Sequence, residues 1–144
     1  MKTVDVLLIG RKTYDGMLAY GQTSYPGAKN YVFTRMKKKS AALKKKLATK
    51  ADKNVEIITA DAAEFVKKLK SKKGKGIAIF GGGELAKSLF EADLIDEVVL
   101  NIHPVLLGSG IPLFHEMKRQ INLELLDCRI LKGGYLAVSY RIKH

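Results

Sequence analysis

The sequence has little of what would place it among secreted, membrane or metal-dependent proteins. Its one cysteine, Cys128, excludes an internal disulfide and suits a reducing compartment. No apolar run approaches the roughly 20 residues of a membrane-spanning helix, and Asp5 interrupts the only apolar stretch near the N-terminus, so no signal peptide is expected. No His, Cys or Asp spacing suggests a metal site. These absences predict a cytoplasmic globular protein without a membrane segment.

The chain of 144 residues is short enough for a single domain, 1–144, and its net charge of +12 is unevenly distributed. The segment Met36–Asn54 holds eight lysines and one acid, Asp52, and forms a lysine-rich insert. Such a field can attract polyanions. However, no aromatic residues lie between the lysines, as stacking on single strands would require. We therefore favour a solvated surface and do not expect specific nucleic-acid binding.

Short apolar runs alternate with amphipathic segments along most of the chain. The pattern predicts strands at Val4–Gly10, Asn30–Arg35, Val55–Thr59, Ile77–Phe80 and Asp96–Leu106, the last of them stopped or bent at Pro104. It predicts helices at Lys12–Gly21, Ser40–Lys50, Asp61–Lys70 and Gly83–Ala92. Two further runs, Leu123–Leu131 and Tyr135–Lys143, flank Lys132-Gly133-Gly134 and predict an antiparallel hairpin. The predicted fold class is α/β, in three layers, with a mixed, mostly parallel sheet flanked by helices.

Three consecutive glycines stand between an expected strand and an expected helix, in IFGGGELA. Gly81, Gly82 and Gly83 fit the G-x-G-x-x-A pattern of dinucleotide-binding folds, but no acid ends the following strand, so a Rossmann domain is not expected. Glycines at a helix start allow a phosphate to approach free backbone N–H groups. The alternative is a tight turn that needs only positive φ.

Two other expected strand ends carry residues suited to an anion. Gly10, Arg11, Lys12 and Thr13 follow the first strand, while Thr34 and Arg35 end the second. Guanidinium and hydroxyl groups are good phosphate donors. Because the carboxyl ends of parallel strands share one edge of a sheet, these residues should meet the glycines there. Separately, each pair could be a capping threonine beside a surface arginine.

The order of these motifs resembles the RibD C-terminal family of riboflavin biosynthesis, which has the dihydrofolate reductase-like fold. The matching segments are LLIGRKTYDGM, YPGAKNYVFTR, GKGIAIFGGGELAKSLFEADLIDEVVLNIHPVLLGSGIPLF and YLAVSYRIK. The resemblance implies an NADPH-dependent reductase of a small heterocyclic substrate, such as 5-amino-6-(5-phosphoribosylamino)uracil or dihydrofolate.

The resemblance also implies roles for particular residues. The cofactor phosphates would be bound by Gly10, Arg11 and Thr13, with Lys12 beside them as a further candidate from its charge alone. The 2′-phosphate would be bound by Thr34 and Arg35, and the diphosphate by the backbone of Gly81, Gly82, Gly83, Glu84 and Leu85. Gly16 and Met17 would line the substrate side. No general acid is evident, because Asp15 could satisfy the start of its own helix and His103 could be structural.

Family members normally begin with a further strand, loop and helix, which we expect to be absent here. Without that central strand, its two neighbours would be left with unpaired backbone groups. Either the neighbours pair with each other or another chain fills the gap, so a homodimer, rearranged or intertwined, is the hypothesis. Three functions stay open: an NADPH-dependent reductase, a catalytically inactive nucleotide-binding or structural module of the same fold, and a basic polyanion-binding protein.

Overall fold

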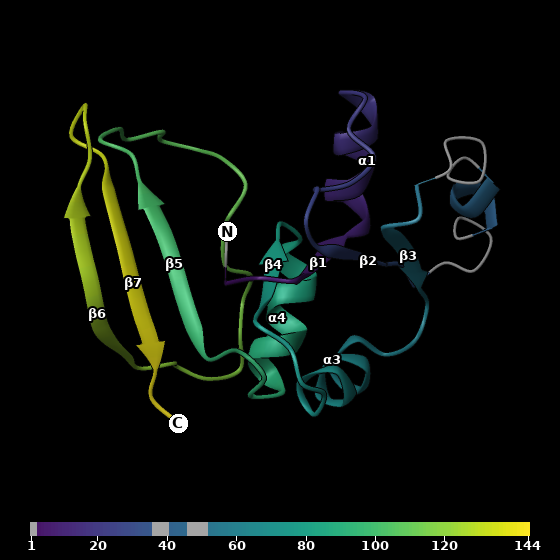
Figure 1. Ribbon diagram of the computed structural model, residues 1–144. Helices are drawn as coiled ribbons and strands as arrows, with labels where there is room; N and C mark the ends of the chain where they lie inside the picture. Colours follow the sequence, from purple (N-terminus) through teal and green to yellow (C-terminus); the bar gives the residue numbers. More distant parts are fainter. Residues whose placement is uncertain (1–2, 36–40, 46–51) are drawn as a thin grey trace.

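The computed structural model describes residues 3–35, 41–45 and 52–144 (Figure 1). Its elements are β1 (Val6–Gly10), α1 (Arg11–Ala19), β2 (Lys29–Phe33), β3 (Val55–Ile58), α3 (Ala62–Lys70), β4 (Ile77–Phe80), α4 (Gly83–Glu91), β5 (Glu97–Ile102), β6 (Leu123–Ile130) and β7 (Leu136–Ile142). This confirms the α/β class. Residues 41–45 are helical, and the rest of the helix expected at Ser40–Lys50, like most of the lysine-rich insert, lies outside the described residues.

Four parallel strands form the first sheet, in the order β3-β2-β1-β4. Its central strand β1 is apolar throughout, because both of its faces are covered. On one face Leu7 and Ile9 pack against Tyr14 and Met17 of α1. On the other face Leu8 packs with apolar residues of α3 and α4. The sheet with helices on both faces gives the three layers that the sequence predicted.

The last three strands form a second, antiparallel sheet in the order β5-β7-β6. The hairpin of β6 and β7 confirms the prediction from the turn at Lys132-Gly133-Gly134, where both glycines have positive φ. The strands are thus divided between two sheets, where the sequence suggested one mixed sheet. The division arises because β4 pairs only with β1 and β5 pairs only with β7 among the described residues. Direct pairing of β4 with β5, one of the two ways of closing the expected gap, does not occur.

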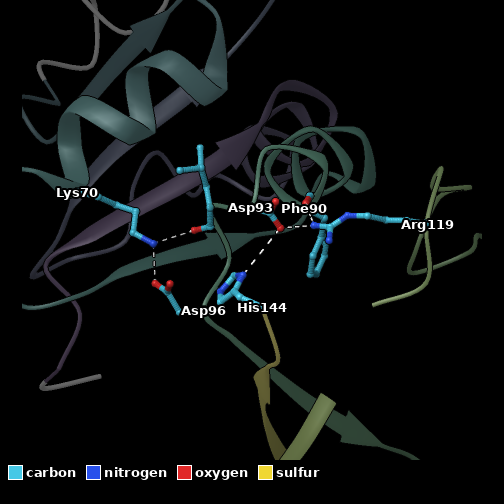
Figure 2. Close-up of polar contacts among 7 residues, drawn as sticks. Lys70, Phe90, Asp93, Asp96, Arg119 and His144 are labelled. Carbon is cyan, nitrogen blue, oxygen red and sulfur yellow. Dashed lines mark hydrogen bonds and ion pairs between the residues drawn. The ribbon is translucent and has the colours of Figure 1, made fainter. Parts of the chain in front are cut away.

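A polar network joins the end of α4 to the second sheet (Figure 2). Lys70 of α3 donates to the Leu94 carbonyl at 3.1 Å and to the Asp96 carboxylate at 2.7 Å. Arg119 pairs with Asp93 and donates to the Phe90 carbonyl at 3.2 Å. These contacts fix the turn that leads from α4 into β5, and so set how the second sheet leaves the first.

Candidate functional site

The glycine turn lies against the start of α1. Gly81 and Gly82 have φ of 65° and 88°, a region that favours glycine, and Gly82 is the residue that precedes α4. A Cβ placed on Gly10 would lie 2.9 Å from the Gly82 Cα, closer than real Cβ contacts allow. The ends of β1 and β4 therefore meet backbone to backbone, and glycine is required on both sides.

The N-termini of α1 and α4 meet at this contact, and neither has a side-chain cap. In contrast, α3 is capped by Asp61, whose Oδ1 accepts from the Glu64 N–H at 3.0 Å. The first turn of α1 also contains no acidic residue. Two helix starts thus present backbone N–H groups and positive dipole ends to the same place, which is an arrangement suited to an anion.

Side chains of the first turn of α1 complete this region. Thr13 packs on Gly81, where a Cβ would meet the Thr13 Oγ1 at 2.5 Å. Arg11 pairs with Asp15 through Nε at 2.8 Å, while its Nη1 is buried without a hydrogen-bond partner among the described residues. A buried guanidinium nitrogen without a partner is costly unless an acceptor reaches it. The Arg11 ion pair also gives Asp15 a structural role.

Thr34 and Arg35, expected as the last residues of the second strand, come directly after β2, which ends at Phe33. The register pairs Gly10 of β1 with Phe33 of β2, which places Thr34 just beyond this edge. Thr34 is buried and donates its backbone N–H to the Ile58 carbonyl at 3.0 Å, whereas Arg35 is exposed. Because adjacent strands lie about 4.8 Å apart, the ends of β2, β1 and β4 span about 10 Å, a width that one extended ligand could cover.

The remaining predicted residues divide by exposure. Lys12 and Glu84 are exposed, and Leu85 is buried in the core beside Leu8, so only its backbone could reach a ligand. Gly16 is exposed with open space around it, but Met17 is buried in the core with Tyr14. The substrate-lining role expected for Gly16 and Met17 therefore stays a prediction, with Gly16 alone open to solvent.

His115 lies beside the candidate site and was not identified by the sequence analysis. A Cβ on Gly83 would lie 2.4 Å from the His115 Nε2, so the imidazole rests on the first residue of α4. A shallow hollow lies beside this contact, bordered by Lys87, Phe90 and Phe114. No sequence signal marks His115, because it lies 32 residues from Gly83 in a loop without periodicity. Only the folding of that loop onto α4 brings the two residues together.

Buried polar contacts fix the segment that follows α1. The Tyr14 hydroxyl, on a fully buried ring, donates to the Thr23 carbonyl at 2.7 Å. Burial and, secondarily, the negative charge of Asp52 raise the pKa of Tyr14 to about 12. Hydrogen bonds, the largest from the Thr23 hydroxyl, hold the pKa of Asp52 below its ordinary value. Asn30, also fully buried, accepts from the Tyr25 N–H at 2.9 Å and donates to the Tyr25 carbonyl at 3.0 Å. These contacts anchor α1, whose N-terminus forms part of the site.

Within residues 3–35, 41–45 and 52–144, no group of three or more His, Cys, Asp or Glu side chains is arranged to hold a metal ion. His103 stacks edge-on against Tyr135 of the hairpin, with ring centroids 4.6 Å apart. In the same described ranges, no helix is long and apolar enough to cross a bilayer.

The chain has the dihydrofolate reductase-like fold. Over 99% of the chain, the structure resembles a dihydrofolate reductase from Enterococcus faecalis solved with NADP(H), with a TM-score of 0.69 and 18% identity, and the match covers 77% of that chain. A protein provisionally assigned to riboflavin biosynthesis in Shewanella sp. PV-4 gives a TM-score of 0.81 at 23% identity, over 99% of this chain and 76% of that one.

Within this fold class, the chain belongs to the RibD C-terminal domain family, whose model matches residues 1–137. Two relatives from Bacillus subtilis (strain 168) are uncharacterized proteins. YyaP is 30% identical over 97% of this chain and 75% of its own length, and YwjB is 36% identical over 86% and 66%. Acinetobacter baumannii RibD gives a TM-score of 0.63 at 18% identity, over 97% of this chain but 47% of that one. The chain thus spans about half of RibD and two thirds to three quarters of the Bacillus proteins.

Proposed function

We propose that the protein is an NADPH-dependent reductase of a small heterocyclic substrate. The observation that carries this proposal is the meeting of two uncapped helix N-termini, at α1 and α4, through the backbone contact of Gly10 with Gly82. The family and the NADP(H) complex of its dihydrofolate reductase neighbour support the choice of cofactor. The proposal names a class of substrate and no single compound, because the two Bacillus relatives are uncharacterized proteins.

The residues at this edge fit a dinucleotide phosphate. The backbone N–H groups at the start of α4 would receive the diphosphate, and those of α1 would share it. The buried Nη1 of Arg11 would then gain an acceptor. Arg35, exposed at the end of the neighbouring strand, would pair with the 2′-phosphate and so favour NADPH over NADH.

The cofactor, when bound, would supply hydride transfer, and the chain's part is to bind and orient it. The core packing of Leu85 and the Thr13 contact with Gly81 hold the phosphate-binding backbone rigid, so little order has to be gained on binding. We do not assign a proton donor to any described residue. The catalytically inactive form of the same fold, the second function left open by the sequence, would bind NADPH equally and differ only in turnover.

The test is an NADPH titration followed by cofactor fluorescence, repeated with NADH and at high salt. We expect saturable binding that prefers NADPH and persists in salt, because a shaped phosphate site is less screened than exposed lysines. Arg35→Ala should weaken NADPH binding about tenfold, the effect of losing roughly 1.4 kcal/mol, and leave NADH binding nearly unchanged. Arg129→Ala is the matched control, since Arg129 is an exposed arginine of β6.

Each alternative has its own outcome. Binding that disappears at high salt would instead support the basic polyanion binder. Equal weakening of NADPH and NADH by Arg35→Ala would remove the 2′-phosphate assignment. Saturable binding without turnover across a panel of pterins and pyrimidines would support the inactive module. A cytoplasmic location follows from the same proposal and is likewise a prediction.

A further inference from the structure

The loop that precedes β6 is held along one side of α4 at two points. Phe114 of the loop meets Phe90 of the last turn of α4 edge-on, with ring centroids 6.0 Å apart. Farther along the loop, Arg119 donates to the Phe90 carbonyl at 3.2 Å and pairs with Asp93, as Figure 2 shows. The Phe90 ring is itself buried. These contacts fix the loop against α4 and so determine where its other side chains lie.

His115 follows Phe114 directly and contacts the other end of α4. Its imidazole rests on Gly83, the first residue of that helix, so closely that a Cβ on Gly83 would overlap the His115 Nε2. The ring is partly buried, and among the described residues it takes part in no hydrogen bond or ion pair. A neutral imidazole still carries one N–H donor. The loop therefore holds a ring with an unused donor beside the start of α4.

The charged side chains beside this contact lie on α4 and on the loop itself. On α4, Lys87 borders the same shallow hollow as His115, and Glu84 is exposed in the first turn. On the loop, Glu116 and Lys118 are both exposed. No carboxylate borders the hollow among the described residues, so the groups that His115 shares it with are a lysine and the positive end of the α4 dipole. This combination attracts an anion.

We propose that His115 is a cofactor-binding residue whose imidazole donates a hydrogen bond to the diphosphate at the start of α4. The inference rests on the proposed function, because it concerns the same diphosphate. Histidine changes its charge between about pH 5 and 8, and a protonated imidazole makes a charge-assisted hydrogen bond that is stronger than a neutral one. The affinity for the dinucleotide should therefore rise as the pH falls through this range.

The first test measures cofactor affinity in His115→Gln, which keeps a neutral donor and loses the charge. At about pH 6 the variant should bind NADPH about tenfold more weakly than the wild type, and at about pH 8 the difference should be much smaller. The 2′-phosphate also changes its charge near about pH 6, so the same comparison with NADH isolates the diphosphate. His103→Gln is the matched control, because the His103 ring stacks on Tyr135 of the hairpin. It should follow the wild type at both pH values.

The second test perturbs the contact from the side of the helix. Gly83→Ala would displace the His115 ring by its Cβ and leave the backbone N–H of residue 83 in place. We expect Gly83→Ala and His115→Ala each to weaken NADPH binding, and the double variant to bind no more weakly than either one. Additive losses of binding free energy would mean that the two residues act separately, and would overturn the inference.

The failure of this inference differs from the failure of the proposed function. A wild-type protein that binds neither NADPH nor NADH saturably would overturn both. Saturable binding with the same pH profile in the wild type and His115→Gln would overturn the role of His115 alone. NMR needs no substitution: saturating NADPH should shift the ring signals of His115 and leave those of His103 in place. Unmoved His115 signals would overturn the inference even if the variants failed to fold.

Discussion

Replacing Tyr14 by Phe should loosen the anchoring of α1 and thereby the N-terminus that the proposed cofactor uses. The substitution keeps the buried ring and removes one hydrogen bond, from the hydroxyl to the Thr23 carbonyl at 2.7 Å. Such a bond contributes about 1 kcal/mol, and a partly buried carbonyl left without a partner adds to the loss. We therefore expect the free energy of unfolding to fall by about 1 to 2 kcal/mol at neutral pH.

The same hydroxyl makes this difference depend on pH. Because the pKa of Tyr14 is raised to about 12 from 10.0, the folded state keeps a proton that the unfolded state releases. The stability that the protonated Tyr14 hydroxyl contributes is fully present below the unfolded pKa and is lost as the pH rises toward the folded pKa. This difference between the folded and unfolded pKa corresponds to at most about 2.7 kcal/mol of unfolding free energy, and solvent near Asp52 reduces that contribution by screening. By about pH 11 we expect a loss of about 1 kcal/mol in the wild type that Tyr14→Phe does not show.

The assay is urea unfolding of the wild type and the variant across neutral to alkaline pH. Other titrating groups occur in both proteins, so the difference between the two curves isolates Tyr14. Tyr20→Phe is the control, because Tyr20 caps the same helix but its side chain is 93% exposed. A wild-type advantage that stays constant from neutral pH to about pH 11 would refute the burial argument. An equal effect of Tyr20→Phe would refute the specific role of the Thr23 contact.

Two further substitutions test the glycine turn at Gly81 and the turn that leads from α4 into β5 at Asp93. Gly81→Ala should lower the free energy of unfolding by more than the roughly 1 to 2 kcal/mol that positive φ alone imposes, because its Cβ would lie 2.5 Å from the Thr13 Oγ1. Gly27→Ala is the control in urea unfolding, since Gly27 has φ of 82° but a Cβ there would meet nothing within 4 Å. Equal losses in the two variants would contradict the importance of the Thr13 contact. Asp93→Val and Asp93→Asn both remove the ion pair with Arg119. Asp93→Val should lower the thermal unfolding midpoint further, because Asp93 has φ of 56° and a β-branched residue is strained in that conformation. Equal midpoints would show that the backbone conformation at Asp93 carries no cost.

Local sequence signals located most elements, because they depend on neighbouring residues. The strand at Ile77–Phe80 was predicted with its observed bounds, and the helix expected at Asp61–Lys70 begins at Ala62 with Asp61 as its cap. The segment expected as a strand to Leu106 stops at Ile102, just before Pro104, whose ring cannot donate to a ladder. Predicted and observed ends elsewhere differ by one or two residues, as fraying terminal turns produce.

Non-local pairing was beyond such signals. Alternation of apolar residues says which face of a strand is buried but does not say which strand lies beside it. The division into two sheets therefore followed only from the register, in which β4 and β5 each have one partner. Met17 shows a similar limit, because its place near a predicted pocket in sequence did not reveal that it faces Tyr14 in the core.

The three consecutive glycines do not all have the same physical explanation. Positive φ explains glycine at positions 81 and 82 but not at 83, which has no such backbone requirement. Each glycine instead lies against a different neighbour: Thr13, Gly10 and His115 in turn. Backbone conformation thus accounts for two of the glycines, whereas close packing against neighbouring groups accounts for all three. Gly83 is thus required by the His115 contact, and binding of an anion at this bare surface is the proposal that the NADPH titration tests.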